Sequence, residues 1–114
     1  MRTALGMACL LAVTSCAYSP KSARDIGRDI ECTGYKSTPA PKPALEAGTC
    51  RSYHNGSVTI FYFADNSARD ALVTRGLADP REPHTYLVGD HFAIDGPPDS
   101  VNEMRQVIDG EYRD

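Results

Sequence analysis

The stretch that decides the fold is TCRSYHNGSVTIFYF, residues 49–63. Asn55-Gly56 near its centre suits a two-residue type I′ turn, whose backbone needs positive φ at both central residues. Residues 49–54 and 57–63 are therefore predicted to pair as an antiparallel hairpin. The second of these segments is apolar at most positions, which is typical of a central strand that is buried on both faces of its sheet.

Three helices are predicted, one before this hairpin in the chain and two after it. Ser22 and Asp25 resemble a capping box, and apolar residues follow them at helical spacing, so the first helix is predicted to begin at Ser22. A second helix is predicted over residues 67–75. The third is predicted to begin around Pro97-Pro98, since proline is favoured in the first turn of a helix.

A second hairpin completes the predicted fold. Residues 85–88 and 91–94 are both apolar, and Gly89-Asp90 between them suits a type II′ turn. The expected domain therefore covers residues 22–114 and belongs to the α+β class, with two α-β-β units and a C-terminal helix. We expect a four-stranded, mainly antiparallel sheet with all helices on one face, because three amphipathic helices need one apolar surface to cover.

The N-terminus has the pattern of a secretory signal peptide, predicted to span residues 1–15. Arg2 gives it a positive start, and the uncharged apolar run ALGMACLLAV follows at residues 4–13. This run is too short for a transmembrane helix, which needs roughly 20 apolar residues.

The end of that segment resembles the bacterial lipobox, an aliphatic residue and two small residues before a cysteine. Here the matching residues are Val13-Thr14-Ser15-Cys16. The resemblance implies a diacylglyceryl group on Cys16, cleavage just before it, and a lipidated tether over residues 16–21. It also implies a location on the extracytoplasmic side of a bacterial cell membrane, where two acyl chains anchor stably. The alternative is an ordinary signal peptide cut near Ser15.

The four cysteines fit this interpretation. Cys9 leaves with the signal peptide and Cys16 takes the lipid, so Cys32 and Cys50 remain in a compartment where disulfides persist. A Cys32–Cys50 disulfide is therefore predicted. Two free buried thiols or half of a metal site are the alternatives. The expected Asn55-Gly56 turn places Cys50 opposite Phe61 in the first hairpin.

The rest of the chain resembles small, uncharacterised exported lipoproteins of actinobacteria. Those proteins combine a helix ending in Cys-Thr-Gly, a Gly-Thr-Cys strand, a VTIYTF-like strand and a VVGDxWAV-like hairpin. The matching segments here are residues 32–34, 48–50, 58–63 and 88–94, with Phe92 where those proteins often carry tryptophan. The resemblance supports export and this fold, and it implies no activity.

No catalytic or metal-binding motif is present in the sequence. It contains no HExxH, no G-x-S-x-G and no phosphate-binding loop pattern, and its net charge of −3 argues against nucleic-acid binding. His84, His91, Asp90 and Asp95 are candidate metal ligands, but their spacing matches no known metal motif. We therefore predict no catalytic residue, no metal and no cofactor, and interpret these side chains as surface groups beside turns.

The aromatic residues of the two hairpins are the candidate binding residues. If the helices cover one face of the sheet, some of these rings are exposed on the other face, and exposed aromatic side chains are typical of binding surfaces. Packing against each other or under the Pro-rich loop, which contains Pro39, Pro41 and Pro43, is the alternative. The residues are Tyr53, Phe61, Phe63, Tyr86 and Phe92.

Three functions are compatible with these features. The first is a membrane-anchored binding or interaction module of the cell envelope, whose partners are the membrane and an unknown envelope protein or ligand. The second is a phage- or prophage-encoded lipoprotein that excludes a second phage. The third is a small envelope enzyme.

Overall fold

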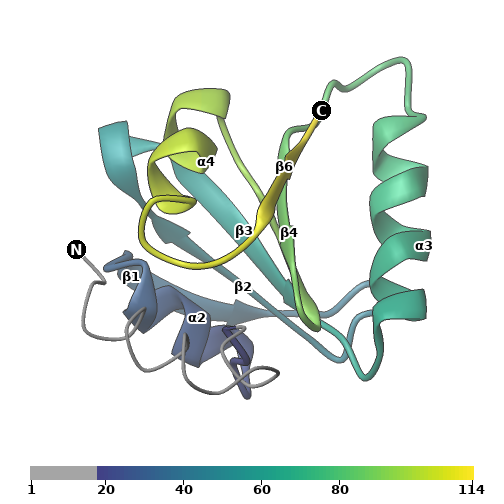
Figure 1. Cartoon of the computed structure of the whole chain (residues 1–114). Helices are drawn as coiled ribbons and strands as arrows, with labels where there is room; N and C mark the ends of the chain where they lie inside the picture. The colour runs from purple at the N-terminus through teal and green to yellow at the C-terminus, as the bar shows by residue number, and fades with distance from the viewer. Residues whose placement is uncertain (1–17) are drawn as a thin grey trace, which may run out of the picture.

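The computed structural model describes residues 18–114, so the predicted signal peptide and the predicted lipid site, Cys16, lie outside the described residues. Within the described chain, three helices and six strands form an α+β fold with one antiparallel sheet (Figure 1). None of the helices in this part is both long and apolar enough to cross a membrane. The helices are α2 (Ala23–Asp29), α3 (Asn66–Leu77) and α4 (Pro98–Met104), with a short 3-10 turn, η1, at Tyr53–Asn55.

The sheet has the strand order β1-β2-β3-β5-β4-β6, and every neighbouring pair is antiparallel. Because β5 lies between β3 and β4, these two strands run in the same direction, and α3 makes the crossover between them. A second crossover, through α4, takes the chain from β5 past β4 to β6. The strands are β1 (Thr33–Thr38), β2 (Glu46–Arg51), β3 (Ser57–Tyr62), β4 (Tyr86–Gly89), β5 (Phe92–Asp95) and β6 (Glu111–Arg113).

Side-chain caps fix where the first two helices begin. The Ser22 hydroxyl accepts a hydrogen bond from the backbone N–H of Asp25 at 3.0 Å, as the capping-box pattern predicts. Asp65 does the same for α3, where its carboxylate accepts from the N–H of Ala68 at 2.8 Å. The third helix begins at Pro98, in agreement with the predicted proline start.

The helices lie on both faces of the sheet, which corrects the expectation that they cover one face. α2 and α4 cover a cluster that includes Ile60 and Ile94, and α3 covers a separate cluster that includes Phe63 and Val88. Figure 1 shows α3 on one side of the strands and the other two helices on the opposite side. The apolar residues on both faces of β3 require this arrangement, since each face must be covered to be removed from water.

The expectation of four strands is also wrong, because β1 and β6 add one strand to each edge. Residues of β1 were predicted to end the first helix and begin a loop, but α2 ends at Asp29 and the chain pairs with β2 from Thr33. A register shift between Thr33 and Lys36 accompanies Gly34, whose φ is +66°. Glycine has no Cβ, so it adopts this left-handed conformation without the steric cost that other residues meet.

The turn of the first hairpin differs from the predicted two-residue turn. Strand β2 ends at Arg51 and strand β3 begins at Ser57, and the residues between them include the 3-10 turn η1. His54 takes the left-handed conformation, with φ of 61°, whereas Gly56, where a type I′ turn needs positive φ, is extended with φ of −75°. The longer turn moves the register, so that Cys50 faces Val58 instead of Phe61.

The predicted disulfide is present in the described chain. Cys32 follows α2, Cys50 lies in β2, and their Cα atoms are 5.8 Å apart across the bond. The bond closes the segment that contains β1 and the Pro-rich loop, and thereby connects the end of α2 to the sheet.

Candidate functional site

The predicted aromatic surface does not exist as an open face. Phe63, Tyr86 and Phe92 are at most 2% exposed, and Tyr53 and Phe61 are half-buried. Phe92 and Tyr53 pack on the side of α2 and α4, whereas the other three rings pack on the side of α3. Because helices cover both faces, these five residues build the core and form no common binding surface.

The segment predicted to be a tether packs closely against the domain from its first described residue. The Tyr18 ring is half-buried and meets Phe92 edge to face, with 5.7 Å between the ring centroids. Ser19 donates a hydrogen bond to Asp90 at 3.1 Å, and Pro20 is buried. Residues 18–20 are therefore part of the folded domain, and Asp90 at the turn between β4 and β5 marks the place where they attach.

His84 and Asp95 form a partly buried pair at the other end of that hairpin. His84 Nδ1 lies 2.7 Å from Oδ2 of Asp95, and both side chains are about four-fifths buried. The imidazole also stacks on the ring of Tyr86, at 5.6 Å between centroids. Burial raises the pKa of Asp95, while the hydrogen bond from His84 opposes that rise.

A cleft of about 440 Å³ opens beside this pair, which is within the size range of small-ligand sites. It lies between the first residues of β3, the segment that leads into β4, and the end of β5. We call it the His84 cleft; its polar lining residues are Ser57, Thr59, Glu82, His84, Thr85 and Asp95. Hydroxyl groups, an imidazole and two carboxylates therefore converge on one surface depression.

The four candidate metal ligands predicted from the sequence separate into two pairs. His84 and Asp95 lie at the His84 cleft, whereas His91 and Asp90 lie at the turn between β4 and β5, with His91 Nδ1 3.2 Å from Asp90. The hydrogen bond from Asn66 is the main cause that lowers the pKa of Asp90. The two pairs lie at opposite ends of the hairpin and do not form one site.

Two acidic residues that the sequence analysis did not select lie beside His84. Oxygen atoms of Asp79 and Glu82 and a ring nitrogen of His84 all lie within 4.8 Å of one another, and such a set is able to ligate a metal ion. Asp79 follows the end of α3, and Glu82 lies in the loop before Pro83. No sequence motif marks these residues, because the loop conformation alone brings them together.

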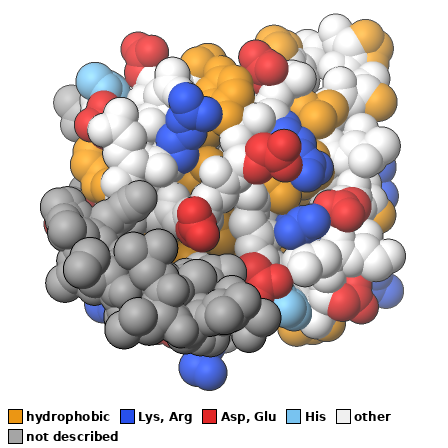
Figure 2. Space-filling view, in the orientation of Figure 1, with side chains coloured by type: hydrophobic (Ala, Val, Ile, Leu, Met, Phe, Trp, Pro, Cys, Tyr) orange, Lys and Arg blue, Asp and Glu red, His pale blue; other side chains and the backbone are white. Residues whose placement is uncertain are grey.

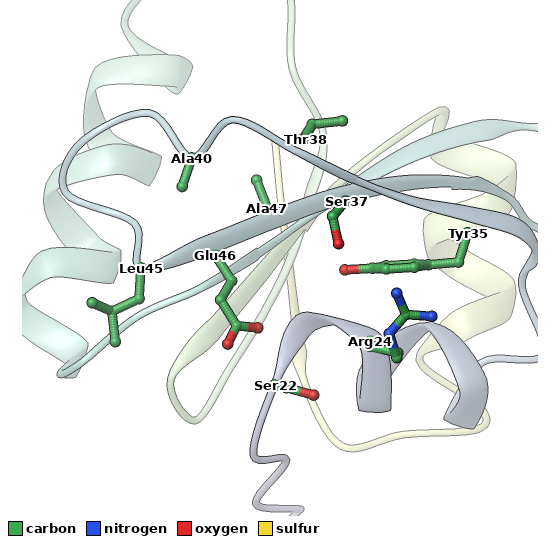
Figure 3. A pocket seen from close by; sticks show the side chains of 9 residues that line it. All are labelled: Ser22, Arg24, Tyr35, Ser37, Thr38, Ala40, Leu45, Glu46 and Ala47. Atoms are coloured by element: carbon green, nitrogen blue, oxygen red, sulfur yellow. The ribbon is translucent and has the colours of Figure 1, made fainter.

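A second cleft, of about 410 Å³, lies between α2 and the β1–β2 hairpin (Figure 3). The guanidinium of Arg24 lies 4.8 Å from the centre of the Tyr35 ring, and Glu46 accepts a hydrogen bond from the N–H of Ala23 at 2.8 Å. Its charged side chains thus serve the fold, Arg24 by packing on an aromatic ring and Glu46 by capping α2. We call it the hairpin cleft, and we regard the His84 cleft as the stronger candidate site.

One face of the molecule carries mixed charges. Figure 2 shows acidic and basic side chains interspersed on the visible face, without an extended basic area there. Comparison with known proteins adds no assignment, since no family model, no curated protein and no solved structure matches the chain.

Proposed function

We propose that this protein is a cell-envelope lipoprotein, anchored through lipid on Cys16, whose folded domain is a binding module that works at the membrane surface without catalysis. The lipobox-like residues before Cys16 support the anchor. The Cys32–Cys50 disulfide agrees with an oxidising compartment outside the cytoplasm. The observation that carries the proposal is the packing of Tyr18 on Phe92, two residues after Cys16.

This packing leaves little free chain between the lipid and the domain. An extended chain spans at most about 3.6 Å per residue, so two residues reach about 7 Å from Tyr18 to the lipidated cysteine. The anchor would therefore hold the β4–β5 turn, where Ser19 contacts Asp90, next to the lipid headgroups.

The His84 cleft lies at the far end of the same hairpin. In Figure 1 the first described residues lie below the sheet, while the loop from α3 to β4 lies at the top. An anchor at the lower end would direct the cleft away from the membrane, toward partners or ligands in the envelope space.

The anchor is tested by replacing its cysteine in a lipoprotein-processing bacterium. Cys16→Ser should abolish labelling by radioactive palmitate and prevent the lipid-dependent cleavage, so that uncleaved precursor accumulates whether or not globomycin is present. Cys9→Ser is the matched control, because that cysteine lies in the apolar run and should not affect lipidation. Normal processing and membrane location of Cys16→Ser would contradict the proposal.

The binding role is tested by filling each cleft with a large side chain. Ser57 and Ser37 are exposed serines on strands, and they line the His84 cleft and the hairpin cleft respectively. Crosslinking in intact cells should show envelope partners that are lost in Ser57→Arg and retained in Ser37→Arg. Identical partners for the wild type and both variants would contradict a binding role for the His84 cleft.

A further inference from the structure

We propose that Asp79, Glu82 and His84 bind a Zn²⁺-like divalent metal ion, with Asp95 as the carboxylate that orients His84. The proposal goes beyond membrane anchoring and does not depend on it, since none of these residues belongs to the N-terminal segment. It rests on the donor atoms that converge beside the His84 cleft.

The contact between His84 and Asp95 prepares the imidazole for a metal. Because a carboxylate accepts hydrogen bonds, the 2.7 Å contact places the ring hydrogen on Nδ1 and leaves the Nε2 lone pair free. Metal-ligating histidines generally donate their second ring nitrogen to a carboxylate or carbonyl in this way, which fixes the tautomer and the ring orientation. Stacking on Tyr86 further restricts rotation of the ring.

Donor atoms of the other two residues lie near the imidazole, since all three ligand atoms fall within 4.8 Å of one another. Nε2 lies 3.8 Å from Oε1 of Glu82, which is too long for a hydrogen bond between them. Ligands of a tetrahedral zinc ion lie roughly 3.3 Å apart, given metal–ligand bonds of about 2.0–2.1 Å. Glu82 is 75% exposed and is free to move the short distance that ligation needs.

The loop after α3 holds Asp79 in position for the third bond. Its Oδ1 accepts a hydrogen bond from the backbone N–H of Arg81 at 2.9 Å, and this turn directs the chain back toward His84. The Arg81 side chain is 90% exposed and lies 3.6 Å from the same carboxylate, so it can withdraw into solvent when a cation binds.

The donor types select the class of metal. One imidazole nitrogen and two carboxylates suit zinc and similar borderline ions, whereas Mg²⁺ and Ca²⁺ prefer sites made only of oxygen. Three protein ligands leave one tetrahedral position for water or a bound molecule. The adjoining cleft of about 440 Å³ provides space for that fourth ligand.

The test is calorimetric titration with ZnCl₂ of the metal-free full chain, without a histidine tag, in which Cys9 and Cys16 are serine to remove competing thiols. We expect one Zn²⁺ per chain, no displacement by excess Mg²⁺ or Ca²⁺, and loss of binding in His84→Ala. X-ray absorption should show a single imidazole nitrogen with oxygen ligands. Absence of stoichiometric binding, or a spectrum without histidine, would overturn the proposal.

Two further variants and one matched control distinguish the loss of a metal ligand from a loss of folding. Glu82→Ala should weaken binding strongly without unfolding the chain, because its side chain is exposed. Asp95→Asn should weaken it roughly 10- to 100-fold, as loss of an orienting carboxylate does in other metal sites. His91→Ala removes the other histidine–aspartate pair and should bind like wild type. Wild-type affinity in His84→Ala or Glu82→Ala would exclude this site.

Discussion

The hydroxyl group of Tyr18 donates a hydrogen bond to Oδ2 of Asp29, at 2.5 Å. Asp29 is the last residue of α2, and the Tyr18 ring also meets Phe92 in β5. The first described residue of the chain thus joins a helix to a central strand. The domain therefore begins before Ser22, where the sequence pattern placed its start.

Removal of the contacts that Tyr18 makes with Asp29 and Phe92 should destabilise the whole domain. Tyr18→Phe deletes the hydrogen bond to the Asp29 carboxylate, which is one-third exposed, and we expect a loss of about 1 kcal/mol in the free energy of unfolding. Tyr18→Ala also removes the edge-to-face contact with Phe92, for a total of about 2 to 3 kcal/mol. Urea unfolding measures both, and wild-type stability in Tyr18→Ala would show that residue 18 is not packed.

Ionisation of Tyr18 in the unfolded chain should lower the free energy of unfolding at alkaline pH. Burial, and then the hydrogen bond to Asp29, raises the pKa of the Tyr18 phenol far above its usual value of 10.0. The contribution of a raised pKa is complete below the pKa of the unfolded state and declines as the pH rises above it, because only the unfolded chain then ionises. Between pH 10 and pH 11, roughly, the free energy of unfolding should fall more steeply in wild type than in Tyr18→Phe. Parallel pH profiles would contradict this assignment.

The disulfide should contribute a large part of the stability. Cys32 and Cys50 are 18 residues apart, and closing a loop of similar length stabilises by about 3 kcal/mol through the unfolded chain. Cys32→Ser, Cys50→Ser and the double variant should each lower the urea midpoint by a similar amount. Reducing agent should lower the wild-type midpoint and leave the double variant unchanged. Insensitivity of the wild type to reduction would contradict the bond.

The orientation of the domain on the membrane can be read with single tryptophan reporters, since the chain contains no tryptophan. Ser19 lies beside the expected anchor, and Leu77 is 37% exposed at the far end of α3. In lipidated protein on vesicles, brominated lipids should quench Ser19→Trp strongly and Leu77→Trp weakly. Equal quenching of the two reporters would contradict an orientation with the β4–β5 turn toward the bilayer.

Local signals in the sequence predicted where the helices begin, but not where the first one ends. The capping residue Ser22 and the proline at Pro98 act within one turn of the helix they begin, so no distant contact is needed to recognise them. The apolar segment of β3 also predicted its central place in the sheet. Its burial on both faces already argued against a sheet covered on one face only.

Apart from the disulfide, which was predicted by accounting for the other cysteines, features that depend on distant contacts were not predictable. Strand β1 has exposed, polar residues at most positions and pairs because the disulfide and Tyr35 hold it against β2 and α2. The ring of Tyr35 lies so close to Gly48 that a Cβ there would come within 2.3 Å of its hydroxyl. The pairing of His84 with Asp95, and the approach of Asp79, likewise depend on how β4, β5 and the loop after α3 meet in three dimensions.

The two outer strands also determine how copies of the protein behave when they are crowded together. An exposed strand edge is a template for pairing with another chain, and proteins commonly blunt it with lysine, proline or short strands. Here β1 carries Lys36, shifts its register near Gly34 and is followed by Pro39, while β6 has only three residues. Both edges are therefore poor templates for aggregation, which favours separate domains at high local concentration.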